Sequence, residues 1–152
     1  RLNLGEAALV SSGFWGALTI GRLLGAVIGS KISQKSLLLY SLAAAAVTGF
    51  VFALTVGVLI PSAASVLLIG FFTGSVYPTV MSLVTTAFPE SPGKAASVIA
   101  AMGSIGGMLI PLAQGYLQEQ VSPAASAWYV TIGLVITFIA MAITGTKLKQ
   151  RA

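Results

Sequence analysis

The chain has 152 residues, of which 57% are hydrophobic and only 7% are charged. A soluble domain carries about 25% charged residues, so this composition excludes an ordinary soluble protein and indicates a membrane protein. The net charge of +5 is scattered between apolar stretches, without the basic stripe and interleaved aromatic residues that a nucleic-acid-binding protein needs, so no nucleic-acid partner is expected.

Five apolar stretches follow one another along the chain. A helix that crosses about 30 Å of hydrocarbon needs about 20 mostly apolar residues, and each stretch supplies them. The stretches are too long and too uniformly apolar for the strands of a membrane barrel. We therefore predict an all-α polytopic membrane protein, with residues 1–152 forming one transmembrane domain. The spans are expected near residues 8–30, 37–59, 63–87, 95–117 and 125–146.

Positive charge falls in every second gap between these spans. Cytoplasmic loops are enriched in Lys and Arg, so this pattern predicts an N-terminus outside and a C-terminus in the cytoplasm. We expect the protein to be integral to the cell (plasma) membrane. An odd number of spans, and a first residue other than Met, favour a piece of a longer protein. The basic residues are Lys31 and Lys35 after the first span, Lys94 after the third, and Lys147, Lys149 and Arg151 after the fifth.

Arg22 is the one charge well inside a predicted span. An Arg near the centre of a membrane helix costs about 2.5–3.5 kcal/mol. Its long side chain could snorkel to lipid phosphates, but at about 100° per residue Arg22 shares a helix face with Trp15 and Thr19, beside a row of glycines. We therefore expect all three to line a polar cavity and bind substrate. A structural partner for Arg22 stays open as the alternative.

Small residues four positions apart allow close approach of membrane helices. Such pairs are concentrated in the first, third and fourth spans, which we therefore expect to pack centrally, while the second and fifth face lipid. The predicted packing residues are Gly21, Gly25, Gly29, Gly70, Gly74, Gly103 and Gly107.

Pro78 and Pro111 lie inside the third and fourth spans. Each removes a backbone hydrogen bond, and interrupted helices mark the binding sites and moving parts of transporters. We predict hinges at both prolines, with Tyr77 and Gln114 as substrate-binding residues. Nearby Ser and Thr hydroxyls could add to this lining, or could simply bond to their own helix backbone. The lining suits an uncharged polyhydroxy solute, or a carboxylate paired with Arg22.

Several short motifs also occur in a recognisable order. They are Gly13-Phe14-Trp15-Gly16, Gly21-Arg22-Leu23-Leu24-Gly25, Gly74-Ser75-Val76-Tyr77-Pro78, Phe88-Pro89, Lys94-Ala95-Ala96-Ser97 and Gly103-Ser104-Ile105-Gly106-Gly107, followed by Pro111 and Gly115. This order resembles the C-terminal portion, helices eight to twelve, of a major facilitator superfamily transporter, and within that family the fucose:proton symporter branch. The resemblance covers essentially the whole chain.

The resemblance implies a two-bundle fold that moves a small polar solute, such as a sugar or related metabolite, by alternating access. It also implies that the chain supplies most of the C-terminal six-helix bundle, with the missing N-terminal bundle as partner and a coupling proton. In that family the eighth, tenth and eleventh helices line the cavity. The chain departs from the family in the stretch 25–31, which lacks the family's loop acid and the arginine beside it, and its predicted spans hold no central acid.

The sequence also bears on two other classes of function. The chain has no His, no Cys and no clustered Asp or Glu, so we expect no enzyme activity, no metal and no cofactor. The alternative to transport is a small membrane protein that acts through helix–helix association with a partner.

Overall fold

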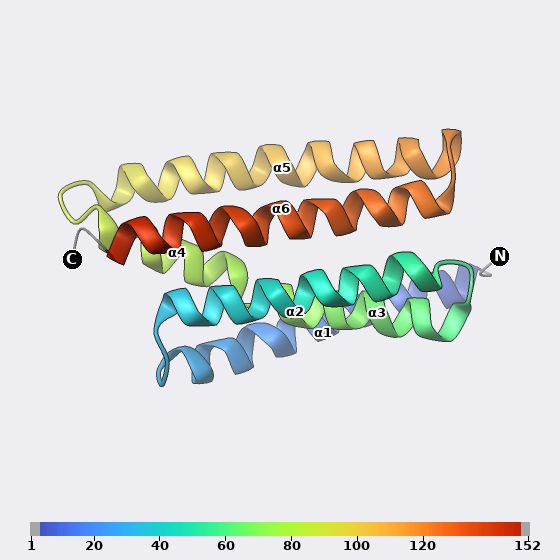
Figure 1. Cartoon of the computed structure of the whole chain (residues 1–152), viewed down its shortest axis with the longest axis horizontal. Helices are drawn as coiled ribbons and strands as arrows, with labels where there is room; N and C mark the ends of the chain where they lie inside the picture. The colour runs from blue at the N-terminus through green and yellow to red at the C-terminus, as the bar shows by residue number, and fades with distance from the viewer. Residues whose placement is uncertain (1–3, 150–152) are drawn as a thin grey trace.

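The structure, a computed structural model, describes residues 4–149, and the side chains of residues 5–144. Arg1, Arg151 and the side chains of Lys147 and Lys149 therefore lie outside the described residues. The described part is helical throughout, with short connections and no strand (Figure 1). The helices are α1 (Leu4–Gly29), α2 (Gln34–Thr55), α3 (Leu59–Thr73), α4 (Val76–Ala87), α5 (Pro92–Gln120) and α6 (Pro123–Lys149).

Five helical segments of the described chain are long and apolar enough to cross a membrane, with α3 and α4 together making one of them. The predicted all-α polytopic fold is thereby confirmed. By length and composition, the candidate spans are Gly5–Gly29, Gln34–Thr55, Leu59–Ala87, Pro92–Gln120 and Pro123–Thr144.

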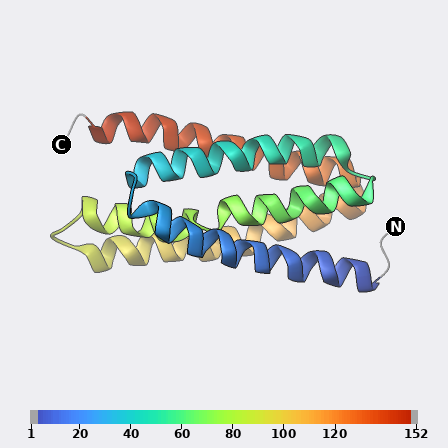
Figure 2. The ribbon, with the colours of Figure 1, turned by 90° about the horizontal axis from the view of Figure 1, so that it is seen from below.

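The helix ends follow local sequence signals. Ser33 caps α2, since its hydroxyl accepts a hydrogen bond from the Ser36 amide at 3.2 Å. Pro92 and Pro123 are the first residues of α5 and α6. The amide at this position has no acceptor within the helix, so proline, which lacks the amide hydrogen, is well tolerated there. The α1–α2 and α4–α5 connections lie at one end of the bundle and the α2–α3 and α5–α6 connections at the other (Figures 1 and 2). Lys31 and Lys94 therefore lie at the same end.

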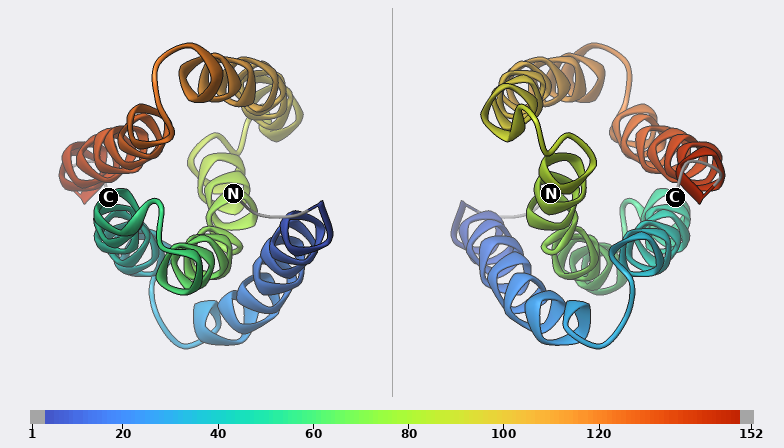
Figure 3. Two further views of the ribbon diagram at one scale, coloured as in Figure 1. Left: turned by 90° about the vertical axis from the view of Figure 1, so that its right-hand side faces the viewer. Right: turned by 90° about the vertical axis from the view of Figure 1, so that its left-hand side faces the viewer.

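Seen along the helices, α3 lies between α1 and α2, α4 lies between α3 and α5, and α6 lies beside α2 (Figure 3). Within the described residues, α2 packs against α3 and α6, whereas α1 contacts neither α5 nor α6. The span of α2 is the most buried, and α5 has no buried residue. The expectation that the second span faces lipid while the fourth packs centrally is therefore wrong within this chain. A high glycine content indicates that a helix has a smooth surface. It does not indicate whether another helix of the same chain packs against that surface.

Glycines on α1 and α3 permit the closest helix contact in the fold. A Cβ added at Gly21 would overlap the backbone carbonyl of Phe71, and one added at Gly25 would overlap Ser75. On the facing helix, a Cβ at Gly70 would lie 2.9 Å from the Phe14 carbonyl oxygen. These two helices therefore pack backbone against backbone.

Three of the other predicted packing glycines, Gly29, Gly103 and Gly107, have looser surroundings. A Cβ added at Gly29 would lie 3.3 Å from the Leu37 side chain, and one at Gly103 would lie 3.5 Å from the Tyr77 ring. No atom of the described chain lies within 4 Å of a Cβ added at Gly107. Close approach is thus concentrated at the α1–α3 crossing.

Thr131 ties α6 to α2. Its buried hydroxyl lies 2.7 Å from the Gly49 carbonyl oxygen on α2 and 2.9 Å from the Ala127 carbonyl oxygen on its own helix. Thr131→Val keeps the shape and removes the hydroxyl, so we expect a loss of about 1 kcal/mol in the free energy of unfolding. Thermal unfolding in detergent checks this. The control is Thr137→Val, because the exposed Thr137 hydroxyl bonds only within α6, to Gly133. Equal losses in both variants would contradict the role of the interhelical bond.

Candidate functional site

The third span is interrupted between α3 and α4. Helix α3 ends at Thr73 and α4 begins at Val76, which places Pro78 in the first turn of α4. The Gly74 amide still donates to the Gly70 carbonyl at 3.0 Å, and the Thr79 amide donates to the Ser75 carbonyl at 3.2 Å. Because Pro78 has no amide hydrogen, the Gly74 carbonyl four residues before it lacks its usual helical partner.

Arg22 fills that gap from α1. Its Nε donates to the Gly74 carbonyl oxygen at 3.4 Å, a long but charge-assisted contact. The approach depends on Gly74 having no side chain. A Cβ there would overlap the Leu18 carbonyl oxygen and lie 2.9 Å from the Arg22 amide nitrogen. The sequence feature that brings Arg22 to the break is therefore the glycine contact between α1 and α3.

An open pocket of about 590 Å³ lies beside this contact, between α1 and α4. Its volume falls in the range of roughly 300–1,000 Å³ typical of small-molecule sites. The residues that line it carry one guanidinium, one phenol and two hydroxyl groups. The Ser82 hydroxyl accepts a 2.7 Å hydrogen bond from Gln34 Nε2 of α2, and the Thr85 hydroxyl donates to the Met81 carbonyl of its own helix at 3.0 Å. The lining residues are Arg22, Tyr77, Pro78, Met81, Ser82 and Thr85.

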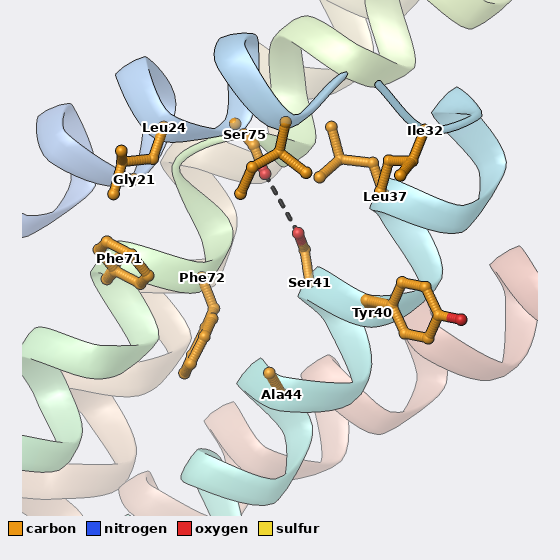
Figure 4. A pocket seen from close by; sticks show the side chains of 12 residues that line it. Gly21, Leu24, Ile32, Leu37, Tyr40, Ser41, Ala44, Phe71, Phe72 and Ser75 are labelled. Carbon is orange, nitrogen blue, oxygen red and sulfur yellow. Dashed lines mark hydrogen bonds between the residues drawn. The ribbon is translucent and has the colours of Figure 1, made fainter. Parts of the chain in front are cut away.

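A second cavity, of about 300 Å³, lies between α1, α2 and α3 (Figure 4). Its lining is almost entirely apolar, and includes Leu24, Phe71 and Phe72. The hydroxyls of Ser41 and Ser75 lie 3.2 Å apart inside it and bond to each other. This cavity therefore suits an apolar group, and the α1–α4 pocket is the better candidate for a polar ligand.

The sequence profile of the Major Facilitator Superfamily matches residues 1–151. The chain belongs to the Major Facilitator Superfamily. This is a family of transporters rather than of enzymes, and the chain is an integral membrane protein.

The chain is similar in sequence to two named members of the superfamily. It is 32% identical over 113 residues to a Helicobacter pylori protein named "Putative glucose/galactose transporter", an alignment that covers 74% of the chain and 27% of the relative. It is 27% identical over 108 residues to the "Glucose/galactose transporter" of Brucella abortus, covering 71% of the chain and 26% of the relative. The matched region is thus about a quarter of the length of these relatives. No solved structure matches the chain.

In this superfamily member, the structure brings together Arg22, Tyr77 and Pro78, three of the residues singled out in the sequence. Trp15 and Thr19 lie on the same helix as Arg22 but do not line the pocket. Trp15 is 63% exposed, and the Thr19 hydroxyl donates to the Trp15 carbonyl at 2.9 Å.

Gln114 and Pro111 belong to a different part of the bundle. Both lie on α5, which contacts α4 and α6 but not α1 within the described residues. Helix α5 is continuous through Pro111, in contrast to the break beside Pro78 (Figure 1). The two prolines therefore sit in different local structures, and only Pro78 adjoins Arg22.

Met81 and Thr85 complete the pocket and were not predicted. Their signal was present in the sequence, since Tyr77, Met81 and Thr85 are spaced four apart and share one helix face. Several other hydroxyls near the prolines bond to their own helices, as the alternative interpretation of the sequence held. They include Thr73 to Ile69, Thr79 to Ser75 and Ser104 to Ala100.

Proposed function

We propose that the chain is part of a secondary active transporter that carries a small polar solute, in the first place a hexose, across the cell membrane by alternating access. The observation that carries the proposal is the meeting of Arg22 and Tyr77 beside the interrupted span. The names of the two relatives support a sugar as substrate.

The pocket has the chemistry to recognise vicinal hydroxyls. The terminal nitrogens of a guanidinium donate in a fixed fork, so Arg22 can bind two oxygens of one solute at once. The phenol of Tyr77 and the hydroxyl of Ser82 can each donate or accept, and the Tyr77 ring adds an apolar surface. Such a mixed lining fits a sugar, which carries polar edges and apolar ring faces.

The remaining parts of the proposal concern the whole transporter. The chain would correspond to helices eight to twelve, as in the fucose:proton symporter branch, with the N-terminal bundle completing the cavity. Trp15, Thr19 and Gln114 would face the central space between α1 and α5, and Pro78 and Pro111 would serve as bending points. A coupling proton would require a carboxylate from outside this chain. The lysines at one end of the bundle support a cytoplasmic position for that end.

Helix–helix association is the second candidate function. It is favoured by α5, where a Cβ added at Gly107 or Gly115 would meet no other atom of the described chain. Such a smooth face suits close approach of another helix. In that case, substitutions of Arg22 would disrupt a complex rather than solute flux.

Uptake of labelled glucose and galactose by cells that express the complete protein tests the transport proposal. Tyr77→Ala is expected to raise the KM for uptake about tenfold, because it removes one hydrogen-bonding group and an apolar surface from the pocket. The control is Tyr40→Ala, which removes a tyrosine that is 72% exposed and lines the apolar cavity instead. No uptake of either sugar above background, or an equal effect of the two substitutions, would contradict the proposal.

A further inference from the structure

We infer that Pro78 positions Arg22 for solute binding: because proline has no amide hydrogen, the Gly74 carbonyl stays open for Arg22 Nε, and this contact holds the guanidinium in the pocket. The inference rests on the proposed function for its solute-binding half. The contact itself, between the residues at the break and α1, does not depend on that proposal.

The acceptor of the Arg22 contact is the backbone carbonyl of Gly74. In a regular helix the amide of residue 78 would donate to the carbonyl of residue 74. The helical pattern resumes one residue later, where the Thr79 amide donates to Ser75. Among the described residues, Arg22 Nε donates a hydrogen bond to the Gly74 carbonyl. Pro78 thus leaves one acceptor unfilled, and a cation from the neighbouring helix fills it.

The contact with Gly74 leaves the terminal nitrogens of the Arg22 guanidinium unused. A guanidinium carries five N–H groups, and the Gly74 contact uses only the one on Nε. The N–H groups of the two terminal nitrogens can still donate to a solute in the pocket that Arg22 shares with Tyr77 and Ser82. Anchoring Nε restricts the motion of the guanidinium before a solute arrives, which would reduce the entropy lost on binding. A lysine offers no second, separate set of donors in a fixed plane, so it would not serve both partners equally well.

Restoring an amide hydrogen at position 78 tests the role of the proline. In the variant Pro78→Ala, the new amide would compete for the Gly74 carbonyl and release Nε. Helix stability should not fall, because alanine is the better helix former. Solute affinity should fall, because the guanidinium loses its anchor. A merely structural role of Pro78 would move stability and affinity in the same direction.

A double-mutant cycle in the complete, detergent-purified transporter tests the contact. Arg22→Gln is expected to lower the Tm by about 2 °C or more in the parent protein, and by less than half as much in the Pro78→Ala background. The matched control is the cycle of Arg22→Gln with Pro111→Ala, which makes the same chemical change on α5, a helix that does not contact α1 in the described chain. There the two Tm shifts should add. An equal effect of Arg22→Gln with and without Pro78 overturns the inference.

Equilibrium binding of labelled galactose and glucose to the same purified variants tests the solute half. Pro78→Ala is expected to raise the Kd about tenfold while its Tm stays level or rises. An unchanged Kd in this variant overturns the inference. Absence of sugar binding by the parent protein instead rejects the proposed hexose substrate. The Tm cycle then still decides whether Arg22 and Pro78 are coupled.

Discussion

Gly21→Ala is expected to prevent stable packing of α1 against α3. The added Cβ would overlap the carbonyl oxygen of Phe71 and lie 2.7 Å from its carbonyl carbon. These are backbone atoms, so no side-chain rotation can relieve the overlap and the helices must separate. Overpacking of this kind costs about 3 kcal/mol or more. Fluorescence-detected size-exclusion chromatography and thermal unfolding of the purified protein measure the loss.

Gly133→Ala is the matched control for this substitution. Gly133 lies on the exposed side of α6, and a Cβ added there meets no atom of the described chain within 4 Å. Alanine also favours the helix by about 1 kcal/mol relative to glycine. We therefore expect the control to fold at least as well as the parent. Comparable losses in both variants would show that the α1–α3 contact does not hold the bundle together.

Arg22→Ala is expected to reduce hexose uptake by the complete transporter at least about 100-fold in Vmax/KM. The substitution removes the cation of the pocket, and each hydrogen bond from a charged donor contributes about 1.5–3 kcal/mol. Loss of two such hydrogen bonds between Arg22 and the solute is sufficient to explain a reduction of about 100-fold in Vmax/KM. Initial rates of labelled sugar uptake, normalised to protein in the membrane, measure it.

Lys94→Ala serves as the control for charge. Lys94 is an exposed basic residue near the start of α5, at the end of the bundle, and does not line the pocket. Its substitution should leave uptake per molecule close to that of the parent. If Arg22→Ala assembles normally and transports at the parent rate, Arg22 has no part in solute recognition. If it no longer assembles, the association function gains support.

The spans could be predicted from the sequence because a bilayer requires apolar helices of a set length. Which helices touch could not be predicted in the same way. In lipid, leucine is equally well accommodated against another helix or against acyl chains, so hydropathy does not mark the buried face. The burial of α2 and the exposure of α5 therefore emerged only from the structure. Glycine spacing did indicate a close crossing, and Gly21 and Gly74 lie at it.

The candidate site was partly predictable for a similar reason. A charge inside a span and a nearby proline stand out by residue type, so Arg22 and Pro78 were found. Their spatial relation was not, since it depends on the α1–α3 crossing that places Leu18 and Arg22 against Gly74. Gln114 was chosen on polarity alone, and the packing of α5 places it on a helix that does not reach α1 within the described residues.

Cysteine accessibility at position 22 tests most directly whether the Arg22 side chain lies in a water-filled solute pocket. The chain contains no native Cys, so Arg22→Cys introduces a single thiol into it. We predict rapid reaction with a water-soluble, charged methanethiosulfonate reagent in the complete transporter. Leu24→Cys, at the apolar cavity, should resist the same reagent. A thiol at position 22 that reacts only with lipid-soluble reagents would contradict the account.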